Sequence, residues 1–422
     1  MDLRYSVDLI KIDRAKRYNK SAIQNLKSKI ASKGKHCMRV GVVGGKLQGV
    51  EAAYLARKAG WEVRLVDRKP GMPASGLCDT FAQADVTDVH DLGKALGAVD
   101  FIIPALEDDR ALESLAHWSR QSDIPLAFDP PTYAVTSSKL KSAEFFRKVG
   151  IPVPRPWPHC SFPVLAKPGV GSGSKGVRVF HDLDSMQNWF APDFPPTDWI
   201  LEEFLEGSQH SLEVIGRPGN YRLLQVTDLE VDENFDCKRV IAPSVLPPDA
   251  IAMFGKLSLT IAEALELHGI MDVEAMYSRG EFKVLEIDAR LPSQTPTAVY
   301  WSTGLNMVRF LQDVAISPID ESSPAENLKC GVVYEHIYVR GHKLETRGEG
   351  IMTECGPLKL QADFFGADEA LTNFASGKDP WIATLIFSDS DQKQTRAKRD
   401  RCISEIIKQF KIKEVVDSHP KF

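Results

Sequence analysis

The chain has 422 residues, 43% of them hydrophobic, and a formal net charge of −5, which predicts a globular protein of two to four domains. No apolar run approaches the roughly 18 residues that a membrane-spanning helix needs, and the N-terminus lacks the apolar stretch of a signal peptide. Seven scattered cysteines without a C-x-x-C pair argue against a zinc site or a disulfide framework, so we expect a cytoplasmic protein with no membrane partner.

The first 37 residues are basic, and their charge of +7 leaves −12 for the remainder. Ile23, Leu26 and Ile30 have the spacing of one side of a short helix, and a basic arm of this kind could contact nucleic acid. Because a strand begins directly afterwards at Met38, we interpret residues 1–37 as an extension without a catalytic role. The acidic remainder argues against nucleic acid as a partner.

Residues 38–130 are predicted to form an α/β domain on a parallel sheet. The strand RVGVV is followed by the loop GGKLQG, the helix VEAAYLARKAG and the strand EVRLVD, which together make a βαβ unit. Two further apolar runs, VDFIIPAL at 99–106 and IPLAF at 124–128, are short enough to be buried strands.

The loop GGKLQG follows the first strand, at the edge of a parallel sheet where ligands bind. A dinucleotide fingerprint would need glycine where Lys46 stands, which disfavours NAD. Asp67 ends the second strand and could bind ribose hydroxyls, so a nucleotide beside Lys46 and Asp67 stays open. Glu107 follows another strand and could hold an ammonium group. The alternative is a tight turn that needs Gly44 and Gly45 for its backbone angles.

A Gly/Ser loop is the strongest phosphate-binding signal in the sequence. FPVLAKPGVGSGSKGVRVF reads as strand, loop and strand, and backbone N–H groups such as those of Ser172, Gly173 and Ser174 could surround phosphates between Lys167 and Lys175. The loop is not a Walker A motif, because no GK[ST] opens a helix, and no H-R-D loop of a protein kinase follows. A flexible hairpin tip is the alternative.

The run DWILEEFLEG at 198–207 is predicted to be a strand with an acidic end. Free backbone groups after Glu202 and Glu203 could bond to an adenine edge, and Glu206 could bind ribose. Taken alone, this pattern is weak evidence for a nucleotide site.

Residues 269–290 are predicted to form a β-hairpin whose polar face is acidic. Odd-numbered residues are apolar in both strands, including Leu285 and Ile287 in the second, so odd positions must face odd positions. An odd-length turn, such as the three residues 279–281, would achieve this. Glu274 then lies opposite Glu286.

Asp288 and Asp272 share the polar face of this hairpin with Glu274 and Glu286. Four carboxylates without His or Cys are typical of a site for Mg²⁺ that also bridges substrate phosphates. The alternative is the solvated face of a two-sided sheet. From about residue 330, the strands VVYEHIYV and WIATLIF and the helix RDRCISEIIKQF predict a small α+β domain over 326–422, which leaves 131–325 as the central domain.

Lys139 in TSSKLKS, the joint GIPVP, Lys167, the Gly/Ser loop, LEEFL and the acidic hairpin follow one another as in ATP-grasp ligases, which the chain resembles over about residues 38–320. Within that superfamily it is most similar to the pyrrolysine-biosynthesis ligases that join 3-methylornithine to lysine. GKLQGVEAAYL, GIMDVEA and EIDARLPSQTPT followed by VYWSTG carry this likeness. Many ATP-grasp enzymes have Glu-x-Asn where this chain has Glu286-Ile287-Asp288, a departure that the pyrrolysine ligases share.

The resemblance implies an ATP-grasp fold, with ATP and Mg²⁺ as cofactors and site residues in four groups. It assigns the nucleotide to Lys139, Lys167, Glu203 and Leu205, and the sequence patterns above add Ser172, Gly173, Ser174, Glu202 and Glu206. Mg²⁺ is assigned to Glu274, Glu286 and Asp288. L-lysine is assigned to Leu47, Gln48 and Glu107, and the ornithine-like substrate to Ser211, Glu213 and the run from Ser293 to Thr295. Asp272 is expected to bind a substrate.

The implied reaction is phosphorylation of the 3-methyl-D-ornithine carboxylate by ATP, followed by attack of the lysine ε-amine and release of ADP and phosphate. Arg290 lies on the carboxylate face and is expected to stabilise the oxyanion and the departing phosphate. Two alternatives stay open: another ATP-dependent ligase or carboxylase, and a nucleotide-binding module without ligase chemistry. A dehydrogenase ranks fourth. The oligomeric state is open, with a homodimer among the options.

Overall fold

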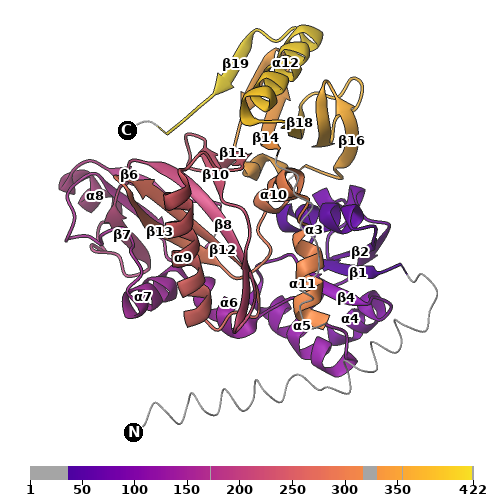
Figure 1. The fold of residues 1–422 in the computed structure, drawn as a ribbon, viewed down its shortest axis with the longest axis horizontal. Coiled ribbons are helices and arrows are strands. Elements are labelled where there is room, and N and C mark those ends of the chain that lie inside the picture. Colours follow the sequence, from indigo (N-terminus) through magenta and orange to yellow (C-terminus); the bar gives the residue numbers. More distant parts are fainter. Residues whose placement is uncertain (1–36, 172, 317–329, 354, 421–422) are drawn as a thin grey trace.

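The computed structural model describes residues 37–171, 173–316, 330–353 and 355–420. The predicted helix around Ile23 to Ile30 and the phosphate-loop residue Ser172 lie outside these ranges. Among the described residues, no helix is long and apolar enough to cross a membrane. Figure 1 shows the N-terminal α/β part beside the central part, with the C-terminal part at the top of the view.

The N-terminal part is a four-stranded parallel sheet in the order β3-β2-β1-β4. Helix α3 packs its buried Tyr54 and Leu55 into a core that also contains Val40 and Val42 of β1. The elements are β1 (Arg39–Val43), α3 (Leu47–Lys58), β2 (Glu62–Asp67), η1 (Pro73–Gly76), β3 (Thr80–Gln83), α4 (Val89–Leu96), β4 (Phe101–Pro104) and α5 (Asp109–Ser122).

One predicted strand of this sheet is wrong. IPLAF at 124–128 makes only an isolated bridge between Leu126 and Ile102. Pro125 has no N–H to donate to a ladder, and the run is only half-buried. At the other edge of the sheet, β3 pairs with β2, and its TFAQ sequence lacks the apolar run that marks a buried strand.

The central part contains a three-stranded antiparallel sheet, β6-β5-β7, beside the large sheet. The Gly/Ser loop connects β5 to β6, as predicted. The elements are α6 (Pro130–Thr136), α7 (Lys139–Val149), β5 (Val164–Pro168), β6 (Arg178–Phe180), α8 (Leu183–Phe190), β7 (Trp199–Glu203), β8 (Ser208–Arg217), β9 (Asn220–Leu223), β10 (Thr227–Val231), β11 (Cys237–Ala242), α9 (Pro248–Ala264), β12 (Gly269–Ser278), β13 (Glu281–Asp288), α10 (Thr295–Thr303) and α11 (Met307–Ile316).

The large sheet runs without a break from the central part into the C-terminal part. Its order is β13-β12-β8-β10-β11-β14-β18-β17-β16, and the junction is the antiparallel pair of β11 and β14. The predicted boundary at 325/326 lies in 317–329, outside the described ranges. The C-terminal elements are β14 (Gly331–Arg340), β15 (Lys343–Thr346), η2 (Glu349–Met352), β16 (Lys359–Phe364), β17 (Ala367–Thr372), β18 (Trp381–Asp389), α12 (Gln392–Phe410) and β19 (Glu414–Asp417).

The hairpin of β12 and β13 has the predicted pairing but not the predicted turn. Glu274 pairs with Glu286, which confirms the expected register. The turn, however, has two residues, Arg279 and Gly280, with φ of 52° and 86°. A bulge between the pairs Glu274–Glu286 and Ala275–Val284 leaves Leu285 unpaired. Because the bulge adds one residue to β13, the two-residue turn still allows Glu274 to pair with Glu286.

Because of this bulge, the predicted apolar face of β13 is wrong before Glu286. Val284 is buried in the hairpin core, whereas Leu285, which was expected there, is half-buried. From Ile287 onward the predicted odd-numbered face is correct, because Ile287 and Ala289 are both in the core. The carbonyl group of Leu285 accepts a hydrogen bond from Lys167 Nζ at 3.1 Å. The bulge therefore connects the acidic hairpin to the strand that precedes the Gly/Ser loop.

Candidate active site

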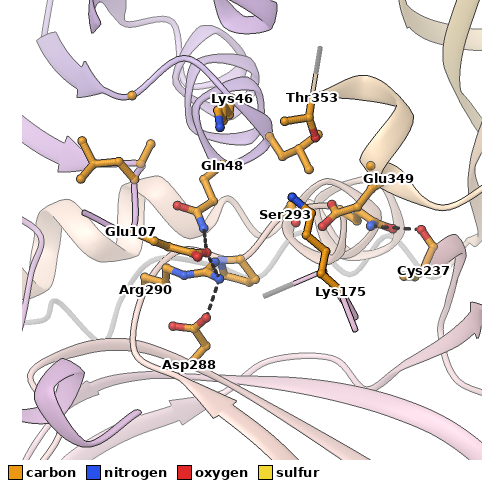
Figure 2. Close-up of a pocket in the computed structure, with 18 of the residues that line it drawn as sticks. Lys46, Gln48, Glu107, Lys175, Cys237, Asp288, Arg290, Ser293, Glu349 and Thr353 are labelled. Carbon is orange, nitrogen blue, oxygen red and sulfur yellow. Dashed lines mark hydrogen bonds and ion pairs between the residues drawn. The ribbon is translucent and has the colours of Figure 1, made fainter. Parts of the chain in front are cut away.

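A cavity of about 1060 Å³ lies where the three parts of the chain meet. Its walls are the loop at 43–48, the Gly/Ser loop, the turn between β10 and β11, the acidic hairpin with the run at 290–295, and η2 with Thr353. Figure 2 shows side chains from all three parts pointing into this space. The sequence prediction had placed the glycine loop, the Gly/Ser loop and the hairpin at one site, and the structure brings them together.

Arg290 joins two of these walls. Its Nη2 lies 2.5 Å from Glu107 Oε1 and 2.6 Å from Asp288 Oδ2, and Gln48 Nε2 donates to the same Glu107 oxygen at 2.9 Å (Figure 2). Burial lowers the pKa of Arg290, but the charges of Asp288 and Glu107 outweigh burial and raise it overall. The guanidinium is therefore a fixed positive charge between the N-terminal loop and the hairpin.

The loop between β1 and α3 depends on glycine at one position. Gly44 has φ +105°, and a Cβ there would lie 2.3 Å from the Ala105 carbonyl oxygen. Asp67 Oδ2 accepts a hydrogen bond from the Gly45 amide at 2.8 Å and Oδ1 accepts one from the Lys69 amide at 2.8 Å. Asp67 thus shapes the loop from the end of β2.

The four acids of the hairpin all line the cavity. Burial and repulsion by Asp272 and Glu286 raise the pKa of Glu274 to about 8. Burial raises the pKa of Asp288 to about 7, although Arg290 opposes the rise. Burial raises the pKa of Asp272 as well, while Ser211 Oγ donates to its Oδ1 at 2.5 Å. Such clustered acids favour a bound cation.

The described ranges contain no group of three His, Cys, Asp or Glu side chains that are placed to hold a metal ion together. Glu286 pairs with Lys139, and Asp288 pairs with Arg290. Even so, Asp288 Oδ1 is buried without a hydrogen-bond partner, and the hairpin offers only oxygen donors. This donor set fits Mg²⁺, which is held by one or two carboxylates together with substrate phosphates.

The two lysines predicted for the nucleotide, Lys139 and Lys167, contact the hairpin but are not among the residues that line the cavity. Lys139, at the start of α7, donates to the Gly171 carbonyl oxygen at 2.7 Å. Lys167 pairs with Glu202 at 2.7 Å in addition to its contact with Leu285. Both lysines therefore connect the Gly/Ser loop region to β13 or β7.

The residues predicted for adenine and ribose, 202 to 206, also lie away from this cavity. The buried Glu203 carboxylate pairs with Arg155 at 2.8 Å and with Lys283, so its side chain holds three segments together. The Glu203 amide donates to the Arg155 carbonyl oxygen. Glu206 is exposed, and Leu205 is half-buried.

The predicted substrate residues divide into two sets. Those that line the cavity are Leu47, Gln48, Glu107, Asp272, Ser293 and Thr295, together with Lys46, Asp67, Gly173 and Ser174 from the nucleotide predictions. Ser211 and Glu213 are not in the lining and lie in β8, the strand that pairs with β12 beside Asp272. Burial raises the pKa of Glu213 to about 7. Ser174 Oγ donates to the Phe235 carbonyl oxygen at 2.7 Å, so the Gly/Ser loop contacts the β10–β11 turn.

Sequence reasoning missed Glu51. This residue of α3 is 1% exposed, and its Oε1 accepts a hydrogen bond at 2.5 Å from the amide of Thr297 in the first turn of α10. A carboxylate at a helix N-terminus is stabilising. Glu51 thereby fixes the run at 293–297, which forms a wall of the cavity. The one signal was an acid inside the apolar helix sequence VEAAYL.

Glu51 gives a pH-dependent prediction. Burial raises its pKa from 4.5 to about 7 in the folded protein. Between these values the unfolded chain has lost the proton and the folded chain retains it, so stability falls as pH rises from 4.5 to 7. Glu51→Gln removes the titrating group. As the pH rises from 5 to 8, the free energy of unfolding of this variant should therefore increase by about 1–3 kcal/mol relative to that of the unmodified protein.

Urea unfolding at both pH values measures this difference, and Glu113→Gln, which changes an exposed acid of α5, is the matched control. A stability difference between Glu51→Gln and the unmodified protein that is the same at pH 5 and pH 8 would contradict the prediction.

Comparisons with known proteins agree with this geometry. A family model for the ATP-grasp domain matches residues 136–294. The chain is 33% identical over 376 residues to the 3-methyl-D-ornithine–L-lysine ligase of Methanosarcina barkeri, which covers 87% of this chain and 98% of that protein.

Solved structures share the fold. Biotin carboxylase from Campylobacter jejuni aligns with a TM-score of 0.67 at 14% identity, over 88% of this chain and 91% of that chain. N5-carboxyaminoimidazole ribonucleotide synthetase from Thermotoga maritima aligns with a TM-score of 0.60 at 20% identity, over 87% and 98%. The predicted ATP-grasp fold is confirmed. With the identity to the M. barkeri ligase over nearly its whole length, the chain belongs to the 3-methyl-D-ornithine–L-lysine ligase family of ATP-grasp enzymes, which form carbon–nitrogen bonds.

Proposed function

We propose that this enzyme uses ATP to join the carboxylate of 3-methyl-D-ornithine to the ε-amine of L-lysine, in pyrrolysine biosynthesis, with release of ADP and phosphate. The observation that carries the proposal is the position of Arg290. It contacts Glu107 of the N-terminal loop region, assigned to lysine, and Asp288 of the hairpin, assigned to the metal. The two substrates would therefore meet at one fixed guanidinium.

The nucleotide phosphates are assigned to the cavity between the Gly/Ser loop and the hairpin. Gly173 and Ser174 line this space, and positive charge comes from the neighbouring Lys175. Glu274, Glu286 and Asp288 would hold Mg²⁺, which would neutralise phosphate oxygens when bound. Glu286 pairs with Lys139 in this structure, so one of its carboxylate oxygens would have to leave Lys139 to bind the metal.

Phosphoryl transfer turns a carboxylate, which is a poor acylating agent, into an acyl phosphate whose leaving group is phosphate. The lysine ε-amine must attack as the free base, and exclusion of water favours this form because burial lowers the pKa of an ammonium group. Negative charge then develops on the carbonyl oxygen. Arg290 is assigned the role of stabilising that charge, since its buried Nε has no hydrogen-bond partner in the described structure.

The acyl phosphate has to be protected from hydrolysis. The hydrogen bond from Ser174 to the Phe235 carbonyl oxygen holds the Gly/Ser loop against the β10–β11 turn. This contact covers one side of the proposed phosphate site, and a closed site excludes the water that would compete with lysine.

Mass spectrometry of products tests the proposal. The enzyme is given MgATP, L-lysine and 3-methyl-D-ornithine, with each component omitted in turn and ADP release followed in parallel. We expect an isopeptide product only when both amino acids are present. ADP release driven by bicarbonate or by a different amine, without this product, would contradict the substrate assignment and leave the ATP-grasp chemistry in place.

A further inference from the structure

Three hydrogen-bonded side chains lie outside the cavity, near the start of β8. Ser208 and His210 alternate along this strand, so their side chains lie on the same face of the large sheet. Gln209, between them, lies on the other face and lines the cavity, whereas Ser208 and His210 do not. The reaction described so far gives Ser208 and His210 no role.

The third side chain is that of Asp228 on β10, the neighbour of β8 in the large sheet (Figure 1). The register pairs Asp228 with His210, and Asp228 Oδ1 lies 2.8 Å from His210 Nδ1. On the other side of the ring, His210 Nε2 lies 2.6 Å from Ser208 Oγ. Asp228 Oδ2 accepts a hydrogen bond from the Val245 amide at 3.0 Å, which holds the carboxylate in this orientation.

These contacts determine where the protons lie. A carboxylate can only accept hydrogen bonds, so His210 Nδ1 carries the hydrogen that it shares with Asp228. In the neutral imidazole Nε2 is then an acceptor, and the Ser208 hydroxyl donates to it. A serine that donates to an imidazole, which is itself oriented by a carboxylate, is the arrangement of an activated nucleophile.

Ser208 is the accessible member of the three. Ser208 is exposed, whereas His210 is 1% exposed and packs edge-on against Phe282, with 6.1 Å between the ring centroids. Apolar side chains flank the site. Tyr277 of β12 pairs with Ser208, and Val245, whose amide holds the carboxylate, is 74% exposed. A reagent with a small apolar acyl group can therefore reach the serine hydroxyl while the imidazole stays fixed.

We propose that Ser208, His210 and Asp228 form a second reactive site, which accepts acyl groups from small activated esters such as aryl acetates. Ser208 Oγ attacks the carbonyl carbon of the ester and its proton passes to His210 Nε2, while Asp228 stabilises the imidazolium. The bond between the carbonyl carbon and the leaving oxygen breaks, and the leaving phenolate takes the proton from His210. A water molecule that gives a proton to His210 then attacks the acyl-serine ester, which releases the carboxylic acid and returns the proton to Ser208.

Two probes test the site in the intact enzyme. A fluorophosphonate should react with Ser208 by the same attack, with loss of fluoride, and mass spectrometry of peptides locates the modified residue. The enzyme should also hydrolyse p-nitrophenyl acetate, and release of p-nitrophenol should fall at least about tenfold in Ser208→Ala. Ser404→Ala is the matched control, since it removes an exposed serine whose hydroxyl donates to a backbone carbonyl group and not to an imidazole.

Two further variants distinguish an activated serine from one that is merely exposed. His210→Gln should slow the labelling of Ser208 by about 100-fold, because it removes the base, and Asp228→Asn should slow it by at least about tenfold. His210 is buried, so Asp228→Asn, at a half-buried position, provides the test if His210→Gln does not fold. Ser208→Ala should retain the release of ADP that depends on MgATP and both amino acids, because Ser208 lies outside the cavity.

A fluorophosphonate label found only on other residues of the unmodified enzyme would overturn the proposal. Labelling of Ser208 at an unchanged rate in folded Asp228→Asn would do the same, because the serine would then react without help from its neighbours. Loss of ADP release in Ser208→Ala would contradict the separation of this site from the ligase cavity.

Discussion

Replacing Arg290 with alanine should lower kcat by about two to three orders of magnitude while nucleotide affinity stays nearly constant. The guanidinium lies between Glu107 and Asp288, where the acyl group and the amine would meet, and not among the residues assigned to the nucleotide. A charge that stabilises the transition state and not the bound nucleotide affects turnover more than binding. Steady-state kinetics and ADP calorimetry measure the two quantities.

Two further variants test whether the position and shape of the Arg290 guanidinium matter in addition to its positive charge. Arg290→Lys retains the positive charge but loses the planar contact with two carboxylates, so we expect it to recover only a small part of the rate. Arg68→Ala removes an exposed cation from the same cavity and should be nearly neutral. A near-normal kcat for Arg290→Ala, or a loss confined to ATP binding, would contradict the role assigned to Arg290.

Replacing Asp288 with asparagine should raise the Mg²⁺ concentration needed for half-maximal activity by at least about tenfold. Asp288 contributes a carboxylate oxygen that has no partner in the described structure, and asparagine is a weaker ligand for a hard cation. Burial raises the pKa of Asp288 to about 7, so a proton competes with the metal below that pH. In the unmodified enzyme, Mg²⁺ should therefore bind more weakly at pH 6 than at pH 8.

The asparagine variant should show a smaller pH effect on Mg²⁺ binding, because position 288 no longer titrates. Magnesium titrations of ADP release at the two pH values measure both effects. Asp85→Asn changes an exposed acid of the same cavity outside the hairpin and is the matched control. An unchanged magnesium titration for Asp288→Asn would remove this residue from the metal site.

Most helices and strands, and the side of each that is buried, could be predicted from the sequence, because the spacing of apolar residues depends directly on both. The predicted pairing of Glu274 with Glu286 was correct although the predicted turn was wrong. The register of the two strands is fixed by which residues are buried, and either a longer turn or a bulge can accommodate that register. A two-residue turn with a bulge at Leu285 meets the same requirement as the expected three-residue turn. The alternation of apolar and polar residues alone does not distinguish a three-residue turn from a two-residue turn with a bulge.

Features that depend on distant contacts were not predictable in this way. Glu51 contacts Thr297, and Gln294 contacts Cys237, across long separations in sequence, and no local pattern marks either pair. The sheet that joins β11 to β14 likewise extends from the central part into the C-terminal part, which the sequence had suggested were separate units. The position of Glu349 at the cavity follows from that continuity.

The formation of an acyl phosphate is the central claim, and transfer of ¹⁸O tests it most directly. The enzyme is given 3-methyl-D-ornithine labelled with ¹⁸O in its carboxylate, together with MgATP and L-lysine, and the products are analysed by mass spectrometry. Attack of the carboxylate on the γ-phosphorus predicts one ¹⁸O atom in the released inorganic phosphate and none in ADP. Unlabelled phosphate, or label found in AMP, would contradict the account.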